Sequence, residues 1–330
     1  MVVLREDMLR VSEIVLRKCM GVKKQEIVLI LTDEPARTIG FHLWIKAREL
    51  AGEAIYIEYT PRKRHGEEPP KPVGEAMKYA DVVLAPTSKS ITHTLARKEA
   101  TEKGVRVGTM PGITEELFLR AFNIDFDMLI RITEIFGKIL DEGNMVRVVT
   151  EKGTDIEFSI EGRKARRSTG ILTEPGSWGN IPSGEAYIAP VEGSENGIIV
   201  VDGSIAGIGL IETPVTLTVR DGIIVDIKGS KEAEKLKKIL SELSIEAKMI
   251  GEFGIGTNPG AKVSGTMLED EKAFGTIHFA LGSNFDFGGT IKAPIHIDMV
   301  VLKPTVYVDN KLVIHKGQPL VDFQLRYDLK

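Results

Sequence analysis

Cysteine is almost absent from this sequence, since Cys19 is the only one among 330 residues. A single thiol excludes an intrachain disulfide and any zinc site built from several cysteines. Cys19 lies in the segment EIVLRKCMG, on the apolar side of an expected helix. We therefore expect its thiol to be packed in a core.

A strong excess of charge of either sign is also lacking. The 43 Lys and Arg residues and the 47 Asp and Glu residues leave a net charge of −4, which gives no electrostatic footprint for nucleic acid. Two short basic clusters, residues 62–65 and 163–167, are not interleaved with aromatic residues, and we expect both to be solvated. Nucleic acid is therefore not expected as a partner.

Long hydrophobic runs are missing as well. No apolar stretch approaches the roughly 18 residues that a membrane span needs. The N-terminal segment MVVLREDM has no basic region followed by an apolar one, so it does not resemble an export signal. We expect no membrane partner and a cytoplasmic location.

The common nucleotide-binding and hydrolase motifs are absent. The segment TDEPARTIG after the first expected strand contains neither G-x-G-x-x-G nor a Walker A sequence, and no G-x-S-x-G occurs in the chain.

A hydrophobic content of 42% is ordinary for a globular protein with substantial cores. A charged content of 27% with so little cysteine is compatible with a thermophilic source.

The first part of the chain alternates apolar strand patterns with helical ones. Such alternation predicts a parallel sheet covered by helices on both faces. The expected strands are residues 26–34, 53–60, 81–88 and 105–110, and the expected helices between and after them end with 125–143. We interpret residues 1–145 as an α/β domain.

The pattern changes after this point to hairpins. Three of them are expected around residues 152–153, 221–222 and 309–310, the second on the Asp-Gly pair that tight hairpin turns prefer. One helix intervenes, at residues 231–247. We interpret residues 146–330 as a mostly antiparallel α+β domain. Two domains agree with the chain length, since a domain typically has roughly 150 residues.

One strand-like segment of the second domain, PIHIDMVV, carries two titratable side chains. His296 and Asp298 occupy alternate positions, so in a strand both would point to the same face. An unpaired buried carboxylate is costly, and a metal ion is one of the few partners that satisfies both groups. The pair therefore indicates a metal site.

Further donors gather in the same part of the chain. His278 lies in the apolar segment GTIHFALG, and three glutamates precede it in turn-rich segments: Glu185, Glu252 and Glu271. Taken singly, the histidine reads as a hydrogen-bonded core residue and the glutamates as capping or solvated acids. Together, two imidazoles and several carboxylates suit Zn²⁺, Mn²⁺, Co²⁺ or Fe²⁺.

At these residues the sequence resembles the aminopeptidase T family of metallo-aminopeptidases, peptidase family M29. The matching segments are IPSGEAYIAPVEGSENGIIVVDGS, GEFGIGTN, DEKAFGTIHFALG and HIDMV. The resemblance implies two divalent metal ions (Zn²⁺, Co²⁺ or Mn²⁺), a peptide substrate and a homodimer. The metal ligands that it implies are Glu185, Glu252, Glu271, His278, His296 and Asp298.

The main hypothesis is accordingly a two-metal aminopeptidase. Two ions would activate a water, and Glu185 or Glu252 would act as catalytic proton shuttle. Four carboxylates supply enough negative charge for two dications, which is why hydrolysis ranks first. Phe285, however, stands where the family has a tyrosine.

Two other functions remain open. The sequence is also similar to a group of the same superfamily, the dihydroxypyridine ring-cleaving dioxygenases, in which His278, His296 and Asp298 would hold one Fe²⁺ as a 2-His-1-carboxylate site. Metal stoichiometry would separate this alternative from the peptidase. The third hypothesis is a non-catalytic relative whose site has decayed.

Overall fold

The computed structural model describes residues 3–320. Met1 and Val2 of the N-terminal segment, and the end of the predicted second domain from residue 321, lie outside the described residues. By its contacts the chain divides into two compact units, Met1–Ile124 with Gly170–Ser183 and Asp125–Thr169 with Gly184–Lys330. Contacts do not test where an independently folding domain ends, so the limit at residue 145 stays a prediction.

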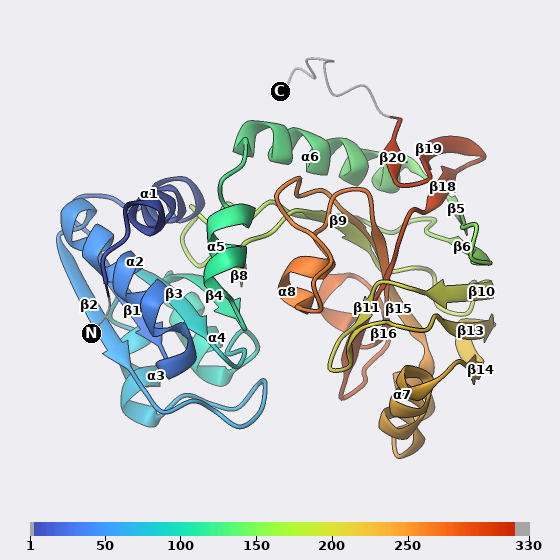
Figure 1. Cartoon of the computed structure of the whole chain (residues 1–330), viewed down its shortest axis with the longest axis horizontal. Helices are drawn as coiled ribbons and strands as arrows, with labels where there is room; N and C mark the ends of the chain where they lie inside the picture. Colours follow the sequence, from blue (N-terminus) through green and yellow to red (C-terminus); the bar gives the residue numbers. More distant parts are fainter. Residues whose placement is uncertain (1–2, 321–330) are drawn as a thin grey trace. The chain divides into compact units, whose positions relative to one another are not determined.

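The first unit contains a five-stranded parallel sheet in the order β2-β1-β3-β4-β8 (Figure 1). Its strands are β1 (Ile27–Thr32), β2 (Glu53–Glu58), β3 (Val82–Thr87), β4 (Arg106–Pro111) and β8 (Trp178–Asn180). The first four are the strands expected from their apolar runs. Strand β8 was not predicted, because three residues carry too little pattern and come from a distant part of the chain.

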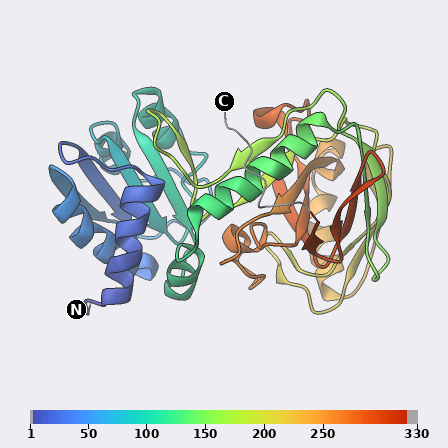
Figure 2. The same ribbon diagram turned by 90° about the horizontal axis from the view of Figure 1, so that it is seen from above.

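Helices cover both faces of this sheet (Figure 2). They are α1 (Glu6–Ile14), which continues into a π-turn at Val15–Cys19, α2 (Arg37–Leu50), α3 (Lys71–Met77), α4 (Leu95–Glu102) and α5 (Glu115–Ala121). Thr94 and Thr114 cap the last two by accepting hydrogen bonds from backbone N–H groups. Cys19 is fully buried, as expected, and burial raises the pKa of its thiol.

The second unit contains an eight-stranded antiparallel sheet in the order β14-β13-β10-β6-β5-β18-β19-β20. Its strands are β5 (Met145–Val149), β6 (Asp155–Ser159), β10 (Asn196–Val201), β13 (Val215–Arg220), β14 (Ile223–Lys228), β18 (Thr305–Val308), β19 (Lys311–His315) and β20 (Gln318–Pro319). All three expected hairpins are present.

A seven-stranded antiparallel sheet completes this unit, in the order β12-β11-β17-β16-β15-β9-β7. Its strands are β7 (Arg166–Ser168), β9 (Glu185–Ile188), β11 (Ser204–Ile205), β12 (Gly209–Leu210), β15 (Ile250–Gly256), β16 (Ile277–Gly282) and β17 (His296–Val301). The α-helices of the unit are α6 (Phe126–Glu142), α7 (Lys231–Ser241) and α8 (Met267–Asp270). The fold class predicted from the sequence, α/β with a parallel sheet followed by antiparallel α+β, is confirmed.

The two antiparallel sheets share one hydrophobic core. Phe158 of the eight-stranded sheet packs against Phe253 and Phe279 of the seven-stranded sheet, with ring centroids 5.2 and 5.8 Å away. Side chains alternate faces along a strand, so the neighbours of Phe253 and Phe279 in their strands point away from this core. That outward face carries the titratable residues described below.

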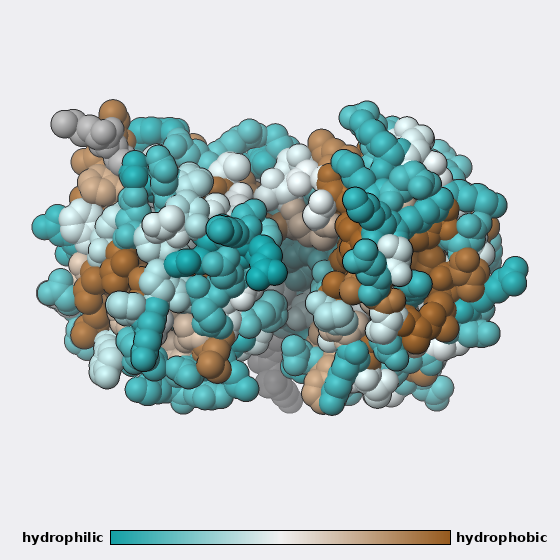
Figure 3. All heavy atoms as spheres, turned by 90° about the horizontal axis from the view of Figure 1, so that it is seen from below, coloured by the Kyte–Doolittle hydropathy of each residue, from teal (hydrophilic) through white to brown (hydrophobic). Residues whose placement is uncertain are grey.

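Among residues 3–320, no helix is long and apolar enough to cross a membrane. Hydrophilic residues predominate on the face shown in Figure 3, and hydrophobic residues are gathered there into separate patches. This distribution agrees with the 27% of charged residues in the sequence.

Candidate metal centre

Five of the six predicted ligands lie on one face of the seven-stranded sheet. Strand pairing sets Asp298 and Glu252 on either side of Ala280, and His278 opposite Gly254. Residues opposite each other in neighbouring strands share a face. The same register places on this face Glu185, which pairs with Gly256, and His296, which pairs with Gly282.

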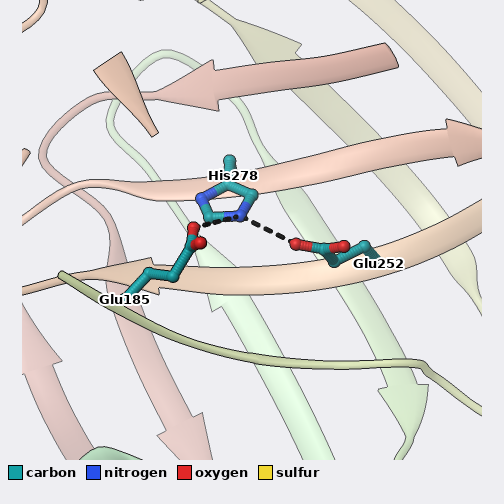
Figure 4. Close-up of side chains that lie close together, drawn as sticks. All are labelled: Glu185, Glu252 and His278. Atoms are coloured by element: carbon teal, nitrogen blue, oxygen red, sulfur yellow. Dashed lines mark hydrogen bonds and ion pairs between the residues drawn. The ribbon is translucent and has the colours of Figure 1, made fainter. Parts of the chain in front are cut away.

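His278 lies between two carboxylates (Figure 4). Its Nε2 is 3.1 Å from Oε1 of Glu252 and 3.6 Å from Oε2 of Glu185. All three residues are buried. A β-bulge between Ile250 and Glu252 interrupts the pairing at this point, and bulges of this kind re-aim a side chain.

His296 joins a second pair of carboxylates. Its Nε2 lies 3.2 Å from Oδ1 of Asp298 and 3.4 Å from Oε2 of Glu252. The other ring nitrogen, Nδ1, lies 2.9 Å from the carbonyl oxygen of Ser283. In this arrangement Nδ1 donates to the carbonyl oxygen, and Nε2 faces the two carboxylates, as a histidine that binds a metal ion through Nε2 would require. The side chain of His296 is 34% exposed, so solvent reaches the cluster there.

The donor atoms fall into two groups that meet at Glu252. Glu185, Glu252 and His278 form one group, and Glu252, His296 and Asp298 form the other, each with ligand atoms within 4.8 Å of one another. Carboxylates and imidazoles of this kind fit a divalent transition metal. His278 is thus in a different group from His296 and Asp298. The three residues of the predicted 2-His-1-carboxylate site therefore do not form one group, and Glu252, which belongs to both groups, links them.

Glu271, the sixth predicted ligand, belongs to neither group. It directly follows helix α8, and its Oε1 accepts a hydrogen bond from Nζ of Lys272. The same Nζ lies 2.9 Å from Oε1 of Glu185. Lys272 thus bridges two of the predicted ligands with its ammonium group.

The charges of the cluster are strongly coupled. Burial alone would lower the pKa of His278, but the hydrogen bond to Glu252 and the negative charge of Glu185 outweigh burial and raise it to about 9. Burial would likewise raise the pKa of Asp298, yet His296 holds it well below its usual range. Burial raises the pKa of Glu271 to about 8, with Lys272 opposing the rise.

These shifts predict how stability depends on pH in the metal-free protein. The pKa of His278 rises from 6.5 to about 9 on folding, so its stabilising effect is complete below pH 6.5 and is lost as pH rises through 9. At about 1.4 kcal/mol per pKa unit, the loss is roughly 3 kcal/mol. The raised pKa of Glu271 acts in the same direction between pH 4.5 and about 8.

Urea unfolding with a chelator present would measure this effect at pH 6.5 and pH 9. We expect a lower free energy of unfolding at pH 9, and a smaller difference in the variant His278→Gln. An equal free energy at both values in the parent protein would contradict the assignment of charge to His278.

Glycines make room for two of the predicted ligands. Gly184, directly before Glu185, has φ of +135°, and an added Cβ would collide with Asn258 and Leu129. Gly254 lies under the imidazole of His278, and a Cβ there would overlap the ring at less than the 3.0 Å that real Cβ contacts keep. Both positions therefore require glycine.

Aromatic side chains border the cluster at its exposed end. The ring of Phe287 meets that of His296 edge-on at 6.0 Å, and Tyr187 packs on Phe287 at 5.3 Å. Phe285 is exposed, and the ammonium of Lys292 lies 4.0 Å above its ring. Sequence reasoning missed Tyr187 and Phe287, because nothing in their local pattern distinguishes them from core residues.

Fold and cluster together define a mixed α/β protein with a candidate metal centre on a β-sheet. Comparison with known proteins identifies the group: the family model of 2,5-dihydroxypyridine 5,6-dioxygenase, NicX, matches residues 7–321, and the chain belongs to this family. A 2,5-dihydroxypyridine 5,6-dioxygenase from Pseudomonas putida is 29% identical over 197 residues. That alignment covers 54% of this chain and 55% of the relative, so it spans only about half the length of that protein.

Two solved structures share the fold. The dihydroxypyridine dioxygenase from Pseudomonas putida has a TM-score of 0.79 at 21% identity, and the match covers 97% of this chain and 99% of that one. AmpT from Thermus thermophilus has a TM-score of 0.73 at 19% identity, and the match covers 96% and 99%. At these identities the likeness shows the fold alone.

The main functional hypothesis from the sequence, a metallo-aminopeptidase, was wrong about the class of enzyme. The family match and the curated relative point to a ring-cleaving dioxygenase, an oxidoreductase, and not to a hydrolase, an aminopeptidase or another metalloprotease. The resemblance to aminopeptidase T holds for the fold only. Its error has a physical source, because the negative charge that seemed to require two metal ions is partly balanced by Lys272.

Proposed function

We propose that the chain is a metal-dependent dioxygenase that cleaves a hydroxylated pyridine or a related aromatic ring. The family match and the relative from Pseudomonas putida support the reaction class. The observation that carries the proposal to this chain is the group of Glu252, His296 and Asp298 on the outward face of the sheet. A cytoplasmic location and a homodimer belong to the same proposal.

The family implies Fe²⁺, and the residues present fit it. Glu252, His296 and Asp298 would hold the ion, with one imidazole and two carboxylates instead of the two imidazoles and one carboxylate expected from the sequence. When bound, iron supplies the redox chemistry through which dioxygen reacts with an aromatic ring. Ser283 keeps His296 oriented through the hydrogen bond to its carbonyl oxygen.

The neighbouring side chains would position the substrate and its protons. His278 contacts Glu252 directly and has a pKa of about 9 in the metal-free protein, so it is the group placed to hold or release a proton beside the ion. Phe287 and Tyr187 form an apolar aromatic border next to the exposed His296. Such a border favours a flat ring over an extended polar chain.

Oxygen uptake tests the proposal. Metal-free protein reconstituted with Fe²⁺ under anaerobic conditions would be mixed with 2,5-dihydroxypyridine, and with other hydroxylated pyridines and benzenes, in aerated buffer. We expect one O₂ consumed for each ring lost from the ultraviolet spectrum. The same protein loaded with Zn²⁺, which has no redox chemistry, is the matched control and should consume none.

The variant Asp298→Asn provides a second control, since it keeps the side-chain shape and removes the charge. We expect it to lose iron binding and oxygen uptake together. Absence of uptake with every ring compound at full iron loading would overturn the proposed reaction, and absence of iron binding would overturn the centre itself.

A further inference from the structure

A lysine is buried inside the carboxylate cluster. The side chain of Lys272 is 3% exposed, and its Nζ contacts Glu185 at 2.9 Å and also the carboxylate of Glu271. It reaches the cluster from the turn after helix α8, where Glu271 and Lys272 are adjacent in sequence. An ammonium group loses its hydration here, so it is stable only because it is paired with both carboxylates.

The cluster contains four carboxylates and therefore needs positive charge. They are Glu185, Glu252, Glu271 and Asp298. The two histidines connect Glu185, Glu252 and Asp298, and Lys272 connects Glu271 to Glu185. One dication beside Glu252 and Asp298 balances only that end. At the other end Lys272 already supplies a fixed positive charge to Glu185 and Glu271.

We propose that Lys272 is a built-in cation that takes the place of a second metal ion and so limits the centre to one divalent ion per chain. The proposal rests on the proposed function only in requiring a metal at Glu252, His296 and Asp298. Glu185 is the residue that decides between one ion and two, because one of its oxygens is bound to Lys272 and the other faces His278.

Like-charge repulsion gives the physical reason. A second dication bound by Glu185, Glu252 and His278 would share the carboxylate of Glu185 with the ammonium of Lys272. Two positive charges on the same carboxylate repel each other strongly in a buried site, because little water is present to screen them. Without the ammonium, both oxygens of Glu185 would be available, and Glu185, Glu252 and His278 could together hold a dication.

The test is the number of ions bound per chain, measured without reference to activity. Metal-free protein would be dialysed against Co²⁺ or Mn²⁺ and analysed for metal and protein content. We expect one ion in the parent protein and two in Lys272→Met, which keeps the length of the side chain and removes its charge. The double variant Glu185→Gln/Lys272→Met should return to one ion, because the second site loses a ligand.

Two control variants isolate the charge of Lys272. Lys272→Arg keeps a cation and should still bind one ion, whereas Lys235→Met removes a lysine from helix α7 and should also bind one. Two ions in the parent protein, or one ion in folded Lys272→Met, would overturn the role of Lys272 and leave the metal centre standing. No ion in either protein would overturn the centre and the proposed function with it.

A measurement on the parent protein covers the case in which Lys272→Met does not fold. Two Mn²⁺ ions that share a carboxylate lie roughly 3.5–4 Å apart and are magnetically coupled. We expect the electron paramagnetic resonance spectrum of the saturated parent protein to show uncoupled Mn²⁺ only. The spectrum of a coupled pair would overturn the proposal.

Discussion

Replacing Glu252 by glutamine is expected to weaken metal binding by at least about 100-fold. Even residues that only support a ligand cost 10–100-fold when they are removed, and Glu252 is the one residue common to both donor groups. It also contacts the ring nitrogens of His278 and His296. A competition titration against a chromogenic chelator would measure the affinity for Fe²⁺ or Co²⁺.

The matched control for this variant is Glu234→Gln. Glu234 lies on the surface of helix α7 and contacts Lys237, away from the donor groups, so its replacement should leave the affinity unchanged. An unchanged affinity in Glu252→Gln would show that the two groups do not share a ligand, and the assignment of the centre would then fail.

Replacing Gly254 by alanine is expected to have the second large effect. The added Cβ would overlap the imidazole of His278, and that ring is enclosed on all sides because His278 is completely buried. Overpacking of this kind costs about 1–3 kcal/mol. We expect a lower free energy of unfolding and, since His278 must move away from Glu252, a weaker metal affinity.

The control is Gly179→Ala in strand β8. There the new Cβ would meet only Leu172, at an ordinary contact distance of 3.7 Å, so stability should change little. Urea unfolding and the chelator titration would be run on both variants. If Gly254→Ala had the same free energy of unfolding and metal affinity as Gly179→Ala, this result would contradict the close contact of His278 with strand β15.

Much of the fold could be predicted because its elements carry strong local patterns. Strands β1 and β3 are nearly continuous apolar runs, and the turn of the β13–β14 hairpin contains the Asp221-Gly222 pair, both at positive φ. Short strands such as β7 and β8 have no such pattern. They exist because neighbouring strands offer them backbone hydrogen bonds, which a local pattern does not record.

The donor residues could be named from the sequence, but their grouping could not. Alternation along one strand was enough to place His296 and Asp298 on one face. The register between strands places Glu252 in both donor groups; it includes a shift between Ile250 and Glu252 that has no local signal in the sequence. Nothing in the sequence around Lys272 marks this lysine as buried, and only the fold shows it.

The ranking of the functions was wrong for the same reason, because the position of Lys272 could not be predicted. Counting carboxylates without knowing the position of Lys272 left its positive charge out of the balance, and this count ranked the hydrolase first. The dioxygenase alternative used the same residues, so no further reading of them would have changed the ranking. The family match decided it.

The two faces of the seven-stranded sheet carry different kinds of side chains, and this separation has a consequence for how the site can vary. One face is packed with Phe253 and Phe279, whereas the donors stand on the other. A mutation that exchanges one donor for another therefore leaves the buried aromatic layer intact. The donor set can therefore change while the layer that joins the two sheets stays in place, which agrees with the shared fold of AmpT at 19% identity.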